Sequence, residues 1–100
     1  MLNTAEKPRP KSGPAAHARH PLASTKAVTI EMEYDADAKA FVTYVKELHR
    51  MSSFGESEEA ALDSTAEMIR GYIRSMEAQR KRIPLSAAKL ADLKEVLRIR

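Results

Sequence analysis

Four carboxylates near the middle of the chain come closest to a set of residues with a chemical function: Glu31, Glu33, Asp35 and Asp37. Carboxylates at alternate positions can hold a divalent cation or act as a general acid and base. Alternate residues of a strand also share one face, however, and acids on the solvent face of a strand are common. The segment from Asp35 to Asp37 lacks the glycine and the distal glutamate of a calcium loop. We therefore expect neither a metal site nor catalysis here.

The histidines and serines also lack the partners that catalysis or metal binding needs. His17 and His20 could share a metal ion only on a helix, which Pro14 and Pro21 disfavour. His49 has no nucleophile whose sequence context supports catalysis. The serines at positions 52, 53 and 57 lack the G-x-S-x-G context of an activated nucleophile. The sequence thus predicts a protein that is not an enzyme and has no cofactor.

Charge and proline divide the chain into a tail and a domain. Residues 1–26 carry five basic residues and one acidic residue, whereas the rest of the chain has a net charge of −1. The tail holds four prolines and no β-branched apolar residue, so we expect it to be disordered. It is either a solvated leader or a segment that neutralises nucleic-acid phosphates. Residues 27–100 are expected to form one small domain.

Composition also excludes several classes of protein. The chain has no cysteine, which rules out disulfides and thiolate zinc sites. It has no apolar run of about 18 residues and no secretory signal, so we predict a cytoplasmic protein without a membrane span. Only five of the 100 residues are aromatic and none is Trp. So thin a core favours stabilisation by homo-oligomerisation.

The longest periodic apolar pattern predicts an amphipathic helix from residue 58 to about residue 79. Ser57 is placed to cap its start, and the acids at positions 58 and 59 favour the positive helix end. The basic residues 80–82 are expected at its far end, with Pro84 terminating it. Its apolar arc consists of Ala61, Leu62, Thr65, Met68, Ile69, Tyr72, Ile73 and Met76.

Period-two patterns predict strands at residues 27–34, 41–45 and 51–54, which supply the surface that this helix must cover. Ser86 is placed to cap a second, shorter helix. Residues 95–100 are compatible with helix or strand, and we favour a fourth strand because it would cover an open sheet edge. The predicted fold class is α+β: an antiparallel sheet of three to four strands packed on one long helix, in the order β-β-β-α-(α)-β.

Small residues form a stripe beside the apolar arc of the long helix. It consists of Ala60, Ser64, Gly71 and Ser75. Gly71 costs about 1 kcal/mol relative to alanine in a helix interior. Either a second helix or subunit packs closely at Ser64, Gly71 and Ser75, or the glycine is merely tolerated.

The block Gly55-Glu56-Ser57 is followed by Ala61, and the pair Ile83-Pro84 comes after the predicted long helix. Through this block above all, and through the Ile-Pro pair, residues 27–100 resemble the HicB-like antitoxin domain family. Further matching segments are residues 30–35, 40–45, 47–48, 61–62 and 72–73. The chain departs from the family pattern at Lys46, His49, Arg50 and Met51, where the family usually has Pro, Pro, Gly and Cys, and at Ala60, where it commonly has Glu. No DNA-binding domain follows within the sequence, which puts operator binding in doubt.

The resemblance implies a partial RNase H-like fold without catalytic carboxylates. It also implies an antitoxin that binds a small, basic, mRNA-cleaving HicA-like toxin and covers its active surface. Acidic residues on the first strand and in the first helical turn are then the expected partner-binding surface. These residues are Glu31, Glu33, Asp35, Asp37, Glu56, Glu58 and Glu59. The alternatives are a solitary interaction module without a toxin, and nucleic-acid binding through the basic tail.

Overall fold

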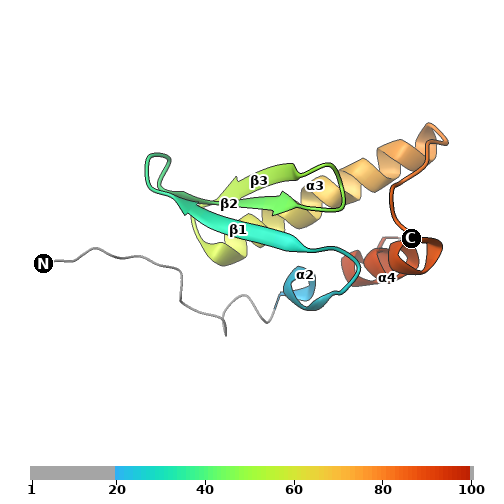
Figure 1. The fold of residues 1–100 in the computed structure, drawn as a ribbon, viewed down its shortest axis with the longest axis horizontal. Helices are drawn as coiled ribbons and strands as arrows, with labels where there is room; N and C mark the ends of the chain where they lie inside the picture. The colour runs from blue at the N-terminus through green and yellow to red at the C-terminus, as the bar shows by residue number, and fades with distance from the viewer. Residues whose placement is uncertain (1–19, 100) are drawn as a thin grey trace, which may run out of the picture.

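A computed structural model describes residues 20–99 as a three-stranded sheet covered on one face by a long helix, with two shorter helices beside them (Figure 1). The elements are α2 (Pro21–Ser24), β1 (Ile30–Asp35), β2 (Ala40–Val45), β3 (Met51–Gly55), α3 (Glu58–Ala78) and α4 (Ala87–Leu97). The α+β class, the three strands and the long helix are as predicted. The expectation for residues 1–19 lies outside the described residues.

The sheet is antiparallel with the strand order β1-β2-β3. Met32 of β1 and Ser53 of β3 both lie opposite Thr43 of β2. Since alternate residues of a strand share a face, these three side chains point to the same side. Thr43 is fully buried and its hydroxyl lies 2.5 Å from that of Thr65 in α3. This side is therefore the helix side of the sheet, and the alternate residues face outwards.

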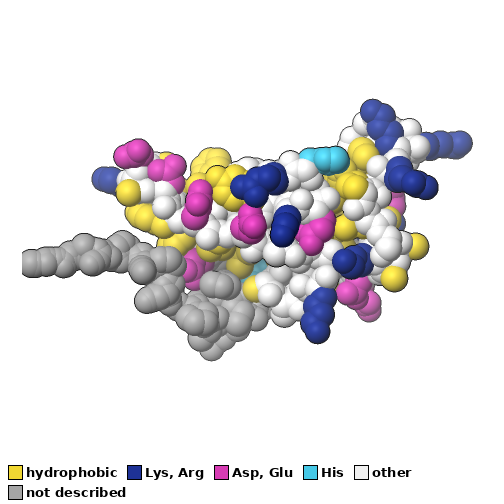
Figure 2. Space-filling view, in the orientation of Figure 1, with side chains coloured by type: hydrophobic (Ala, Val, Ile, Leu, Met, Phe, Trp, Pro, Cys, Tyr) yellow, Lys and Arg dark blue, Asp and Glu magenta, His cyan; other side chains and the backbone are white. Residues whose placement is uncertain are grey.

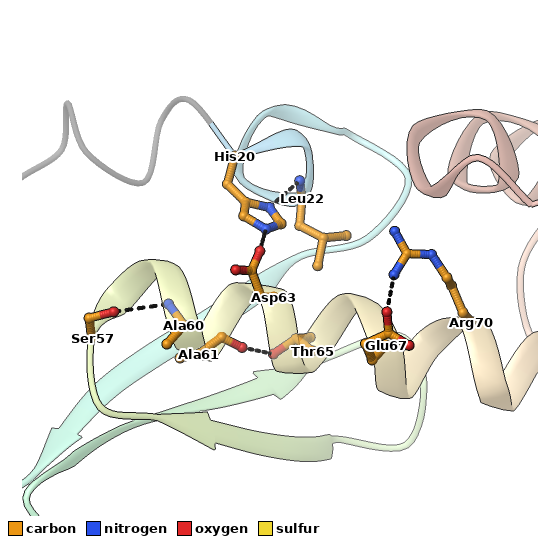
Figure 3. A network of polar contacts seen from close by, with 9 residues as sticks. All are labelled: His20, Leu22, Ser57, Ala60, Ala61, Asp63, Thr65, Glu67 and Arg70. Carbon is orange, nitrogen blue, oxygen red and sulfur yellow. Dashed lines mark hydrogen bonds and ion pairs between the residues drawn. The ribbon is translucent and has the colours of Figure 1, made fainter.

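Helix α3 begins and ends with identifiable caps. The Ser57 hydroxyl accepts a hydrogen bond from the Ala60 N–H at 3.0 Å, as the sequence predicted (Figure 3). At the other end Arg80 has a left-handed backbone, and the Lys81 N–H donates to the Met76 carbonyl at 2.8 Å. This pattern stops the helix at Ala78. The basic residues 80–82 thus lie beyond the helix, and Pro84 is not what ends it.

The predicted fourth strand is wrong, because residues 95–97 continue helix α4. Leu93 and Leu97 are one helical turn apart, and both are buried in the main hydrophobic core. The Arg70 side chain of α3 donates its Nε hydrogen to the Leu97 carbonyl at 2.9 Å, which satisfies a helix-end acceptor. Packing of the two leucines and this bond favour helix where propensity left the choice open.

The predicted domain boundary at residue 27 also needs correction, because residues 20–26 pack against the domain. Leu22 of α2 is 1% exposed and belongs to the same core as Val28 and Leu62. His20, expected to be solvated, is 8% exposed: its Nδ1 accepts the Leu22 N–H at 3.1 Å, and its Nε2 lies 2.8 Å from Asp63 Oδ1 (Figure 3). The average composition of residues 1–26 does not indicate that Leu22 is buried or that His20 caps its helix.

Gly55 is where the backbone of β3 passes against the first turns of α3. A Cβ at this position would lie 2.4 Å from the Ala61 nitrogen and 2.5 Å from the Ala60 carbonyl carbon. Gly55 has no positive φ, so the requirement is space rather than backbone conformation. Gly71, in contrast, would place a Cβ with nothing within 4 Å.

We predict opposite effects of alanine at the two glycines. Gly55→Ala forces backbone against backbone and should lower the free energy of unfolding by about 3 kcal/mol or more. Gly71→Ala removes only the helix penalty of glycine and should raise the free energy of unfolding by about 1 kcal/mol. Urea denaturation followed by circular dichroism measures both. Equal effects of the two substitutions would contradict the close approach at Gly55.

Candidate partner-binding surfaces

The outer face of the sheet is the surface that α3 leaves open. The strand register places Glu33, Val42 and Phe54 side by side across the three strands of this face. Phe54 is 68% exposed, and Tyr44 follows on the same face of β2. The face therefore combines carboxylates with exposed aromatic surface, a composition typical of protein interfaces. The sequence pattern indicates the acids on this face but not Tyr44, because the alternation in residues 41–45 is blurred.

A small polar network crosses this face. Arg50 Nη1 donates to Glu31 Oε1 at 2.9 Å, and its guanidinium lies 4.6 Å from the centre of the Tyr44 ring. The Tyr44 hydroxyl donates to Glu33 Oε2 at 3.3 Å, and the negative charge of Glu33 is the foremost cause that raises the pKa of Tyr44. Acidic and basic side chains accordingly alternate over the strands in Figure 2. Glu31 has a cationic partner here, whereas Glu33 has only the phenol.

The two aspartates of the predicted acidic set belong to the turn after β1. Asp35 Oδ1 accepts hydrogen bonds from the N–H groups of Asp37 and Ala38 at 3.0 and 3.2 Å. Such a turn is a common reason for an aspartate at this position. Both aspartates remain exposed, so they also contribute negative charge at this end of the sheet.

The acids in and before the first turn of α3 do not join the acids of β1. Glu58 is 8% exposed, which removes it from the accessible surface. Glu59 is exposed on α3, which covers the opposite side of the sheet from Glu31 and Glu33, and Glu56 is exposed in the connection between β3 and α3. The seven predicted residues thus do not all share one face.

A groove of about 440 Å³, lined by both apolar and polar residues, runs along β1. Its lining residues are Leu22, Ala23, Thr25, Lys26, Val28, Thr29, Ile30, Met32 and Leu62. At one end, Glu47 accepts hydrogen bonds from the Thr29 N–H and hydroxyl at 2.7 and 2.9 Å. Burial alone would raise the pKa of Glu47, but the bonds from Thr29 outweigh it and lower the pKa. No local pattern predicts this groove, because residues 20–26 have the composition of the polar, proline-rich tail.

The stripe of small residues lies on a free flank of α3. The opposite flank is covered, because Asp63 contacts His20, Arg70 contacts Leu97 and Glu77 contacts Lys94. In the stripe, Ser64 is half-buried whereas Gly71 and Ser75 are exposed. Ser75 accepts a hydrogen bond from the Gln79 side chain at 2.9 Å. No packing in the described part of the chain explains a glycine at position 71.

Residues 20–99 contain no group of three or more Asp, Glu or His side chains placed to hold a metal ion. Within the same residues, no helix combines the length and hydrophobicity needed to cross a membrane. Comparison of the chain with protein-family models, curated proteins and solved structures gave no match. Inferences about function therefore rest on the surfaces described above.

The polar network on the outer face predicts a measurable coupling between Glu33 and Tyr44. Glu33→Gln removes the negative charge that disfavours the phenolate, so the pKa of Tyr44 should fall. NMR titration of the Tyr44 ring signals measures the pKa, and Glu95→Gln on α4 is the matched control. An unchanged Tyr44 pKa in Glu33→Gln would show that the two side chains do not meet in solution.

Proposed function

We propose that the protein is an antitoxin of HicB type that binds and neutralises a small, basic, mRNA-cleaving toxin. The observation that carries the proposal is the open outer face of the sheet, where the exposed Phe54 of β3 shares a face with Glu31 and Glu33 of β1 and β2 lies between them. The resemblance in sequence supports it through Gly55, Ser57 and Ala61, which here form the junction between β3 and α3. A partial RNase H-like fold is part of the same proposal.

The two kinds of residue on the face have different roles in the proposed complex. A buried aromatic anchor supplies most of the affinity in many interfaces. In the proposed complex Phe54 is this anchor, and the half-buried Val42 lies beside it. Carboxylates such as Glu33 steer a basic partner and set its orientation. Since the toxin must bind RNA phosphates, its active surface would itself be basic, and occupying that surface blocks cleavage.

We predict that charge and aromatic changes on this face weaken neutralisation. The partner is first identified by pull-down with the full chain from its native host, and binding is then measured with the purified partner. Glu31→Lys with Glu33→Lys should reduce the association rate by about tenfold at low salt. Phe54→Ala should raise the dissociation constant by about tenfold or more.

Asp92→Lys with Glu95→Lys on α4, two exposed positions, is the matched control for charge and should leave binding unchanged. If the toxin binds all three variants with the same rate and affinity as the original chain, the interface lies elsewhere. If no RNA-cleaving partner is captured and none lies beside the gene, the protein is instead a solitary interaction module.

A cluster of cations favours nucleic-acid binding as a second candidate function. Arg80, Lys81 and Arg82 are all exposed where the chain leaves α3. Such a cluster can neutralise phosphates together with the basic residues of the N-terminal segment. The affinity for RNA or DNA is measured at several salt concentrations, for the original chain and for a variant with glutamine at these three positions. A weaker salt dependence of the affinity in the variant would support this function over the first.

The free flank of α3 leads us to propose, in addition, that the protein self-associates there. Gly71→Leu adds a large side chain to the flank that contains Ser64 and Ser75, and should lower the oligomer size in light scattering. Arg74→Leu, an equally exposed position towards the other side of the helix, is the control and should not change it. An unchanged size in Gly71→Leu would exclude this flank as the contact.

A further inference from the structure

Among residues 20–99, β1 pairs only with β2, so its other edge offers a row of backbone hydrogen-bonding groups. The Lys46 N–H donates to the Thr29 carbonyl at 3.1 Å, which fixes the alternation of bonds between β1 and β2. In an antiparallel pair, every second residue bonds to the neighbouring strand and the residues between point away. Continuing from Thr29, the residues that point away from β2 are Ile30, Met32 and Tyr34. Their N–H and C=O groups match the spacing of a further strand.

The surroundings of this edge differ between its two sides. On the helix side lies the groove along β1, and Ile30 and Met32 line it together with Leu22 of α2 and Leu62 of α3. On the outer side lie Glu31 and Glu33. An incoming strand would therefore place alternate side chains over these apolar groove residues and beside carboxylates.

The charge on the outer side is only partly compensated. Glu31 is paired with Arg50, but Glu33 has the Tyr44 hydroxyl and Asp35 has backbone amides as partners. The negative charge of Glu33 is also the foremost cause that raises the pKa of Tyr44. A cation on the neighbouring strand would be attracted here.

We propose that β1 is a docking edge for an extended segment of another protein in which apolar residues alternate with lysine or arginine. The segment adds a fourth strand to the sheet, its backbone bonds to Ile30, Met32 and Tyr34, and its apolar residues fill the groove. Its basic residues lie beside Glu33 and Asp35. The identity of the partner rests on the proposed function, in which the segment belongs to the toxin; the recognition chemistry does not.

Two other occupants fit this edge less well. A second copy pairing symmetrically through β1 would place its own acids opposite Glu31 and Glu33, which is unfavourable. The N-terminal segment of the chain contains Pro8, Pro10 and Pro14, which have no N–H to donate to a ladder.

The test uses the full chain and a synthetic peptide of about eight residues in which lysine and valine alternate. Amide hydrogen exchange of the protein is measured by NMR with and without saturating peptide. We expect exchange at Ile30, Met32 and Tyr34 to slow by about tenfold. A peptide with glutamate in place of lysine, and one with a central proline, are the controls and should have no effect. Glu33→Lys should reverse the preference between the lysine and glutamate peptides.

Each other outcome overturns the proposal in a recognisable way. Slower exchange at Ser52 and Phe54 would move the docking edge to β3. Slow exchange of the edge amides without peptide would mean that the edge is already occupied. The occupant is a second copy of the chain if this protection depends on protein concentration, and the N-terminal segment if it does not. If the lysine and glutamate peptides slow amide exchange equally, the edge does not recognise charge. If neither peptide slows exchange, β1 is not a docking edge. Because no toxin is used, the result is separate from that of the neutralisation experiment.

Discussion

The contact between Gly55 and the first turns of α3 is the constraint on which the arrangement of the domain depends. Strand β3 ends against the backbone at Ala60 and Ala61, and no side chain fits between them. Two residues later, Ser57 caps α3, so the helix direction is set immediately after the strand. The helix then covers one face of the sheet, and its Thr65 hydroxyl meets that of Thr43 in the dry interface. The opposite face stays open as a direct result.

The two shorter helices are held to one flank of α3 by polar contacts as well as by the core. His20 joins α2 to Asp63, and Arg70 joins α3 to the last carbonyl of α4. A helix-end carbonyl that is buried without a partner is costly, so the bond from Arg70 secures the end of α4 as well as its position. One flank of α3 is thereby filled, whereas within residues 20–99 nothing lies against Gly71 and no strand pairs with the outer edge of β1.

The distribution of charge gives the open sheet its character. Acids that appear alike in the sequence have different roles: Asp35 forms a turn, Glu58 is buried, and Glu33 faces solvent beside Tyr44. A uniformly acidic surface would attract any cation. In the proposed complex, carboxylates interleaved with Arg50 and Tyr44, with Phe54 across β2 from them, would select a partner of matching shape and pattern.

Local patterns in the sequence were sufficient for the three strands, the long helix and its cap at Ser57. Each depends on residues a few positions apart, and period-two and helical spacing record them directly. The alternating acids of β1 were likewise placed on a solvent face by their spacing alone. Spacing alone could not show whether the acids of β1 and those at the start of α3 share one surface. That depends on which side of the sheet the helix covers.

Tertiary packing decided the remaining features, which have no local signature. Leu22 lies in a polar, proline-rich segment and is recognised as core only where it meets Val28 and Leu62. Residues 95–97 are helical because Leu93 and Leu97 share one side of a helix and Arg70 reaches the Leu97 carbonyl from a distant part of the chain. The groove along β1 exists only because α2 docks beside it. Periodicity reports the shape of one element, whereas burial and hydrogen bonding between elements depend on contacts between residues far apart in the sequence.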